Sequence, residues 1–142
     1  MTYLDTGCLV KLYYPEPESG RIIARVQGKV ICYTPLHELE FLNALQLKVF
    51  SGGATAAQVK AARESVAADL AAGVLRSTGW EWPQIFQEAV RLAERHTDTL
   101  GCRSLDILHC ATARIVGAAE FITTDTRQIK LAGRVALNLI VI

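Results

Sequence analysis

Residues 120–126 read EFITTDT, a short β-prone run that ends on an acid and leads directly into a helical pattern. The apolar part is typical of a buried strand, and Asp125 stands where that strand should end. Residues 2–5 repeat the arrangement at the start of the chain, with Asp5 as the closing acid. Ligands of open α/β sheets bind outside the carboxyl ends of the strands, so these two acids indicate a site at one sheet edge.

Helical and strand-like runs alternate along the rest of the chain. Three further strands are predicted at residues 30–33, 74–77 and 139–142. Helices are predicted at residues 6–14, 18–26, 35–51, 56–72, 83–95 and 105–116, with a short one from Thr126. The alternation predicts a single α/β domain over residues 1–142 with a mainly parallel sheet.

The two helices in the middle of the chain have the clearest boundaries. Thr34 is placed to cap the first, and Thr55 with Gln58 forms a capping box at the start of the second. Glycines follow both helices, so the pair predicts a helical hairpin arm whose packing partner the sequence leaves open. Two helices should each bury one apolar face: Leu36, Leu39, Leu42, Leu45 and Val49 in the first, and Ile85, Phe86, Ala89, Leu92 and Ala93 in the helix from residue 83.

Composition limits the class of protein. The chain has 142 residues, of which 51% are hydrophobic and 20% charged, and its formal net charge is +1. These values suit a globular domain and exclude a protein that coats nucleic acid through net charge alone. No stretch of roughly 18 residues lacks a charge and no secretion signal is evident, so we expect a cytoplasmic protein without membrane spans. The four cysteines lack a C-x-x-C pair and are expected to be buried and reduced.

Two more acids can converge on the same sheet edge. Asp106 lies in the first turn of a helix that Ser104 is placed to cap, and Glu40 lies in the helix that follows Thr34. Taken singly, each has a plain alternative: Asp106 can complement the helix dipole, and Asp125 can cap the next helix. Taken together, clustered carboxylates favour a hard divalent cation such as Mg²⁺ or Mn²⁺. Zinc held by Cys102, His109 and Cys110 is less favoured, because a structural zinc site needs four ligands.

The segments around these acids resemble the four acidic motifs of PIN domains, in the order and spacing of the toxin ribonucleases of VapBC-type toxin–antitoxin pairs. The resemblance spans essentially the whole chain and is most specific around Asp106. Glu38 is a departure, because it offers a second acid beside Glu40; the distance from Thr34 and the Asn-Ala-Leu that follows favour Glu40. The matching segments are Leu4-Asp5-Thr6, Leu39-Glu40 with Asn43-Ala44-Leu45, Leu105-Asp106-Ile107-Leu108-His109 with Ala111-Thr112-Ala113, and Phe121-Ile122-Thr123-Thr124-Asp125.

The resemblance implies a PIN-like three-layer α/β/α fold and a divalent-metal-dependent endoribonuclease that cleaves single-stranded RNA, the toxin of a toxin–antitoxin pair. Asp5 and Asp106 would bind Mg²⁺ or Mn²⁺, and Asp125 would complete or orient the site. Glu40 would hold a second ion or position the attacking water. A cognate antitoxin and a homodimer are implied as partners.

Other residues receive supporting roles or none. Hydroxyls expected to hydrogen-bond the carboxylates belong to Thr6, Thr124 and Ser104. Basic residues that either bind flanking phosphates or carry solvated charge are Lys11, Arg103, Arg127 and Lys130. Apolar residues that either fill the core or meet a partner are Tyr13, Tyr14, Leu42, Leu47, Val49 and Phe50. His109 is expected to be a packing residue, and His37 and His96 show no functional pattern.

Two alternatives belong to other functional classes. Asp5-Thr6-Gly7 is also the triplet of aspartic proteases, but those enzymes are β-rich and the reading leaves the other three acids unexplained. The second alternative is a non-catalytic PIN-like module that binds RNA or protein. The presence of all four acids favours the enzyme.

Overall fold

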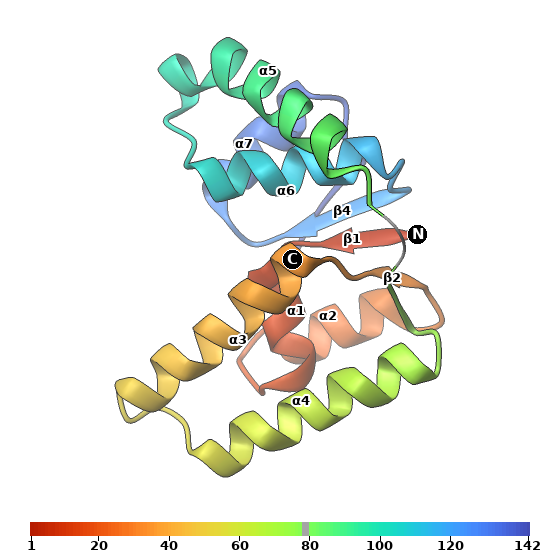
Figure 1. Ribbon diagram of the computed structural model, residues 1–142, viewed down its shortest axis with the longest axis vertical. Helices are drawn as coiled ribbons and strands as arrows, with labels where there is room; N and C mark the ends of the chain where they lie inside the picture. Colours follow the sequence, from red (N-terminus) through yellow and green to blue (C-terminus); the bar gives the residue numbers. More distant parts are fainter. Residues whose placement is uncertain (78–79) are drawn as a thin grey trace. The chain divides into compact units, whose positions relative to one another are not determined.

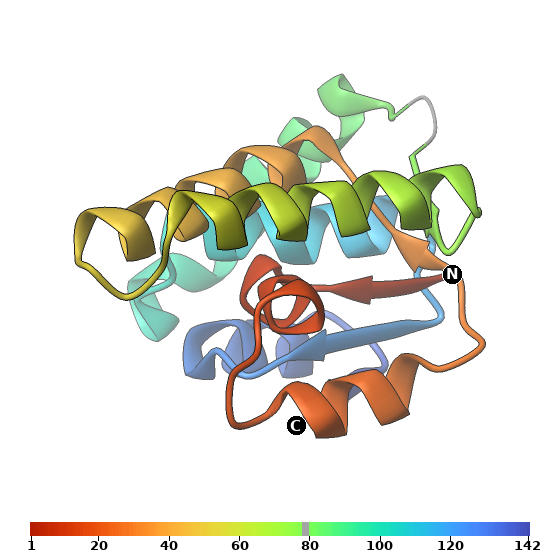
Figure 2. The ribbon, with the colours of Figure 1, turned by 90° about the horizontal axis from the view of Figure 1, so that it is seen from below.

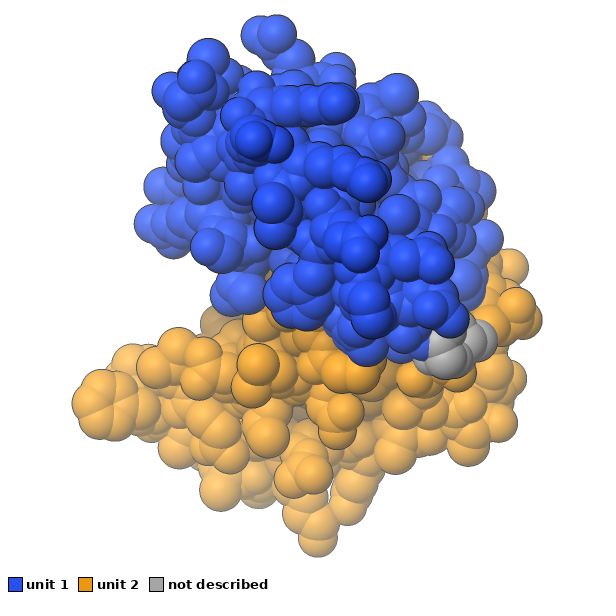
Figure 3. Space-filling model, turned by 45° about the horizontal axis from the view of Figure 1, so that its top comes forward, with its two compact units in different colours: residues 1–5, 79–142 blue, residues 6–78 orange. Residues whose placement is uncertain are grey.

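The computed structural model describes residues 1–77 and 80–142, and two views of its ribbon are shown in Figure 1 and Figure 2. In these residues seven helices and five strands alternate along the chain. No helix in the described part combines the length and the apolar composition that a membrane crossing requires. The chain divides into two compact units, residues 1–5 with 79–142 and residues 6–78 (Figure 3).

The unit of residues 1–5 and 79–142 is built on three parallel strands. These are β1 (Thr2–Leu4), β4 (Glu120–Thr123) and β5 (Leu139–Val141), with β4 in the middle. Its helices are α5 (Trp82–Leu100), α6 (Ser104–Ile115) and α7 (Thr126–Arg134). Figure 2 shows β1 and β4 side by side. Because the two strands are parallel, their carboxyl ends meet at one edge, as the sequence predicts.

Aromatic side chains form the centre of this unit's core. Tyr3 and Phe121 are paired in register, fully buried and stacked with ring centroids 5.7 Å apart. The Tyr3 hydroxyl lies 2.9 Å from Nδ1 of His109 in α6, so both polar groups have a partner inside the core. His109 is therefore a packing residue, as predicted. Residues 106–113 of α6 are all buried, which makes α6 the most enclosed helix of the unit.

The unit of residues 6–78 consists mainly of helices. They are α1 (Thr6–Tyr13), α2 (Ser19–Val26), α3 (Pro35–Phe50) and α4 (Ala56–Ala71). Strands β2 (Ile31–Cys32) and β3 (Leu75–Arg76) pair in parallel. Both units thus combine helices with parallel strand pairs, which confirms the α/β class.

Helices α3 and α4 form the predicted hairpin, which is coloured from orange through yellow to light green in Figure 1. Thr34 and Thr55 cap them as expected, each side chain accepting the N–H of the third helical residue. Gly52 ends the first helix at a φ of 77°, a left-handed conformation that favours glycine. The Tyr13 hydroxyl of α1 donates to Asp69 Oδ2 of α4 at 2.7 Å, so α1 is a packing partner of the arm. Burial raises the pKa of Tyr13 and the Asp69 carboxylate raises it further, which keeps the donor protonated.

Three predictions about helix faces and ends are wrong. Leu39 is 68% exposed, because the buried face of α3 runs through Leu36, His37, Phe41 and Leu45 instead. Phe86 is 56% exposed, and the buried face of α5 is formed by Ile85, Ala89 and Leu92. Helix α5 also continues past the predicted end at Arg95 to Leu100, where Gly101 in the left-handed region stops it.

Candidate functional site

The first two predicted acids follow the parallel strands β1 and β4. Asp5 comes directly after β1; its backbone N–H donates to the Ile122 carbonyl at 3.0 Å, and the residue is 3% exposed. Asp125 caps α7 just beyond β4 and is half-buried. Since β1 and β4 are paired and parallel, both acids lie at the same edge of this unit's sheet.

The side chain of Thr123 connects these two acids. Its Oγ1 donates to Asp5 Oδ2 at 2.5 Å and accepts the backbone N–H of Asp125 at 2.9 Å. The strand register explains the first bond: Leu4 pairs with Ile122, so Asp5 lies opposite Thr123 and their side chains share a face. Thr123 is fully buried, so both hydrogen bonds are shielded from water.

Asp106, the third acid, lies in the first turn of α6 and is 9% exposed. Its Oδ2 accepts the backbone N–H of Arg103 at 3.1 Å. This bond makes Arg103 the N-cap of α6, which corrects the predicted cap at Ser104. A carboxylate at the third helical position reaches back to the cap residue three positions earlier, and Ser104 is left as an exposed first helical residue.

Gln128 of α7 connects Asp106 to Asp125. Its backbone N–H donates to Asp125 Oδ1 at 3.1 Å. Its side-chain Nε2 donates to Asp106 Oδ1 at 3.5 Å, a long hydrogen bond. Hydrogen bonds therefore join a set of residues that form the acid network: Asp5, Thr123, Asp125, Gln128 and Asp106.

Asp125 also has the ordinary role of a helix N-cap. Its Oδ1 accepts the backbone N–H groups of Arg127 at 2.7 Å and Gln128 at 3.1 Å. The sequence leaves this capping role open, and the structure confirms it. Capping uses Oδ1, and none of the hydrogen bonds described for residues 1–77 and 80–142 uses the second carboxylate oxygen.

Buried thiols respond to the charge of the acid network. The pKa of Cys110 is raised first by burial, then by Cys102 and by the charges of Asp106, Asp5 and Asp125. All three carboxylates of the acid network therefore raise the pKa of one buried thiol. All four cysteines are buried, as predicted.

Two basic residues near the acid network affect the pKa of Cys102 in the direction opposite to that of the acids. Burial raises the pKa of Cys102, Asp106 and Asp125 raise it further, and Arg127 and Lys130 lower it. Neither base forms an ion pair with Asp106 or Asp125 among the described residues. Of the other predicted phosphate-binding residues, Arg103 is exposed in the same unit, whereas Lys11 of the second unit pairs with Glu18 at 3.3 Å.

The donor set of the acid network suits a hard divalent cation. Its three carboxylates supply oxygen atoms only, and two of them have no basic partner in residues 1–77 and 80–142. The described residues contain no group of three or more His, Cys, Asp and Glu side chains close enough together to hold a metal ion. The three acids therefore have the ligand type that a hard divalent cation prefers. For such a cation to bind, their carboxylate oxygen atoms must come closer together.

Glu40, the fourth predicted acid, belongs to the second unit. Its Oε2 accepts the hydroxyl hydrogen of Thr6 at 2.7 Å, so Thr6 binds a carboxylate as expected. Glu40 is half-buried, whereas Glu38 is exposed in the first turn of α3. This difference favours Glu40 as the acid of the second motif.

Sequence reasoning missed Thr123, Gln128 and His37. Thr124 is predicted from the sequence as a hydroxyl that bonds the carboxylates and Thr123 is not, although the alternation along β4 turns Thr123 toward Asp5. The Asp-x-x-Gln spacing of residues 125–128 was a signal for Gln128, although it predicts a capping box and not a contact with Asp106. His37 is fully buried and its Nδ1 accepts the Thr34 N–H at 3.1 Å, which completes the cap of α3.

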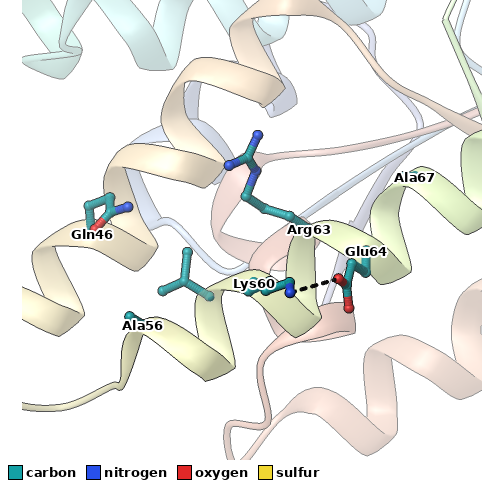
Figure 4. A pocket seen from close by; sticks show the side chains of 7 residues that line it. Gln46, Ala56, Lys60, Arg63, Glu64 and Ala67 are labelled. Carbon is teal, nitrogen blue, oxygen red and sulfur yellow. Dashed lines mark ion pairs between the residues drawn. The ribbon is translucent and has the colours of Figure 1, made fainter.

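Two surface hollows lie elsewhere in the units. One of about 410 Å³ lies between α3 and α4; Figure 4 shows Gln46, Arg63 and the Lys60–Glu64 ion pair, 3.8 Å long, at its wall. The other, of about 360 Å³, lies between α5 and α6 and is lined mainly by apolar side chains such as Phe86 and Leu105. None of the four predicted acids lines either hollow, so the acid network is the stronger candidate for a catalytic site.

Comparison with protein-family models matches residues 2–134 to the family described as PIN domain. The matched segment contains all four predicted acids together with Thr123 and Gln128. A comparison with curated proteins gives no significant match.

Proposed function

Because the chain belongs to the PIN domain family, whose members are mostly metal-dependent nucleases, we propose that it is a divalent-metal-dependent endoribonuclease acting on single-stranded regions of RNA. The observation that carries the proposal is the acid network, which joins three carboxylates at one edge of a parallel sheet. Clustered carboxylates suit cation-assisted hydrolysis of a phosphodiester.

Each residue has a defined part in this proposal. Asp5, Asp106 and Asp125 would hold Mg²⁺ or Mn²⁺, and Thr123 keeps Asp5 in position through its hydroxyl. When bound, the cation lowers the pKa of a water molecule, orients the scissile phosphate and offsets charge on the leaving oxygen. Glu40, held by Thr6, would position the attacking water or hold a second ion. Arg127 and Lys130 are the candidates to bind flanking phosphates.

A matched pair of variants tests this assignment. Purified protein is incubated with Mg²⁺ and a labelled single-stranded RNA, and products are separated on a denaturing gel. Glu40→Gln is expected to slow cleavage by about 10²-fold, because the amide has lost the negative charge of the carboxylate and takes no proton from water. Glu38→Gln neutralises an exposed acid on the same helix and should leave the rate nearly unchanged.

Single-stranded DNA of the same sequence is the substrate control and should remain intact. Equal losses in the two variants would contradict the assignment of Glu40. RNA that is bound but never cut by the unmodified protein would contradict the nuclease and identify a non-catalytic binding module.

We further propose that the enzyme is the cytoplasmic toxin of a toxin–antitoxin pair and works as a homodimer. Helix α3 exposes apolar side chains that a partner's helix or strand can cover: Leu39 is 68%, Leu47 56% and Phe50 90% exposed. Two of these, Leu47 and Phe50, belong to the predicted partner surface. The other members of that predicted surface are less exposed: Tyr13, Tyr14, Leu42 and Val49.

Expression in bacteria tests the toxin role. Inducing the unmodified chain is expected to stop growth, because RNA cleavage interrupts protein synthesis, whereas Asp5→Asn should let growth continue. Optical density after induction gives the result, and immunoblotting confirms equal amounts of the two proteins. Normal growth with the unmodified, active chain would contradict a toxin. Sedimentation of the purified protein at the mass of one chain would contradict the homodimer.

A further inference from the structure

Two glutamines occupy the same position of their helices, the third residue after the N-cap. Gln58 has this position in α4, which Thr55 caps, and Gln128 has it in α7, which Asp125 caps. A glutamine at this position ordinarily completes a capping box by accepting the backbone N–H of the cap residue. Gln58 therefore shows which hydrogen bonds Gln128 would form if it acted only as a capping residue.

Gln58 follows the ordinary pattern. Its Oε1 accepts the Thr55 N–H at 2.8 Å, and its own backbone N–H donates to Thr55 Oγ1 at 3.2 Å. The residue is exposed, and its carbonyl oxygen has the donor that a capping box provides.

Gln128 does not complete a capping box at the start of α7. The Asp125 N–H donates to Thr123 Oγ1 at 2.9 Å instead, so the backbone N–H of this cap residue already has an acceptor. The Gln128 side chain turns toward Asp106, with Nε2 3.5 Å from Oδ1. Thr123 therefore takes the place of the capping glutamine, and the glutamine amide joins the acid network.

The amide oxygen of Gln128 is buried without a hydrogen-bond donor among the described residues. The residue is 6% exposed, so bulk water has little access to it. Reversing the amide gives no better arrangement, because Oε1 would then face a carboxylate oxygen of Asp106. A buried carbonyl oxygen without a donor is unfavourable, so its environment calls for a partner outside the protein chain.

We propose that Gln128 belongs to the metal site, where its Nε2 holds Asp106 and its Oε1 provides an additional oxygen toward the divalent cation. This inference rests on the proposed function. Side-chain amide oxygens are ligands of hard divalent cations. Gln128 contacts Asp106 through its side chain and Asp125 through its backbone, so it lies between two of the carboxylates assigned to the ion. Its oxygen adds a donor without adding to the negative charge of the three acids.

The experiment compares Gln128→Met with Gln58→Met. Methionine has a similar length and removes both polar amide atoms at each position. Mn²⁺ binding to the full chain is measured by calorimetry without RNA. Gln128→Met is expected to weaken Mn²⁺ binding roughly tenfold or more, the usual result of removing a group that orients metal ligands. Gln58→Met should leave Mn²⁺ affinity unchanged and lower the thermal midpoint, because it loses a capping hydrogen bond.

Melting in EDTA separates this role from a structural one. Because Gln128→Met removes an oxygen that has no donor, the metal-free variant is expected to be at least as heat-stable as the unmodified protein. A lower midpoint in EDTA together with unchanged Mn²⁺ affinity would overturn the proposal and assign Gln128 to packing.

Gln128→Glu keeps the side-chain shape and provides a second test if the methionine variant does not fold. A fourth carboxylate beside the ion should enlarge the rise in thermal midpoint that Mn²⁺ produces, and a rise equal to that of the unmodified protein would overturn the proposal. Failure of the unmodified protein to bind Mn²⁺ would instead reject the proposed function as well. Equal Mn²⁺ binding by the unmodified protein and Gln128→Met would reject the role of Gln128 alone.

Discussion

Removing divalent metal with EDTA is expected to abolish cleavage of single-stranded RNA, and Mg²⁺ or Mn²⁺ in excess of the chelator is expected to restore it. The acid network explains the size of the effect. Without a cation, its carboxylates repel the phosphate, and neither Asp106 nor Asp125 has an ion-pair partner among the described residues. Asp5, Asp106 and Asp125 would hold a cation that offsets most of their negative charge and supplies an activated water, so its loss should cost roughly 10³-fold or more in rate.

Rates of product formation on a gel, before and after dialysis against EDTA, provide the measurement. Far-UV circular dichroism in EDTA should show a folded protein, which separates loss of the ion from loss of the fold. Cleavage that survives exhaustive chelation would contradict the metal-dependent mechanism.

Replacing Asp106 by Asn is expected to reduce cleavage by roughly 10³-fold or more, about 4 kcal/mol of transition-state stabilisation. Asparagine keeps the shape of the side chain, and its carbonyl oxygen can still accept the Arg103 N–H that Asp106 accepts at 3.1 Å. The cap of α6 is therefore retained while the charge that attracts the cation is lost. Asp98→Asn, at an exposed position of α5, is the matched control and should cleave at the normal rate.

Melting of the Asp106→Asn protein adds a second readout. In EDTA the variant should be more stable than the unmodified protein by about 0.5–2 kcal/mol, because one of three like charges is removed. Mg²⁺ should stabilise the unmodified protein more than the variant, since the variant has lost a ligand. A variant that is less stable in EDTA, responds equally to Mg²⁺ and cleaves normally would show that Asp106 serves only the helix terminus.

Local interactions explain which parts of the fold the sequence predicted. Thr34 and Thr55 cap their helices through hydrogen bonds that span three residues, so a short window contains the whole signal. The same holds for the strands that precede Asp5 and Asp125, whose apolar runs are contiguous. Ser104 is an exception, because it is predicted to cap α6 and the N-cap is Arg103, whose backbone N–H donates to the Asp106 carboxylate.

Helix faces were predicted less well, since a buried face depends on the surface it meets. Leu39 and Phe86 have helical spacing to buried neighbours and are nevertheless exposed. Successive residues of a helix are about 100° apart around its axis, so a small rotation of the helix about that axis changes which apolar residue faces the core. No pattern within the helix specifies that angle.

The sequence by itself determined the α/β class, the helical hairpin and the position of Asp5 and Asp125 at the ends of parallel strands, because these follow from periodicity, caps and chain order. Only the tertiary structure decided which side chains hold the acids. Thr123 meets Asp5 across the β1–β4 register, and Gln128 meets Asp106 from another helix. Both contacts join residues far apart in the chain, and their hydrogen bonds depend on distances of about 3 Å that folding alone sets.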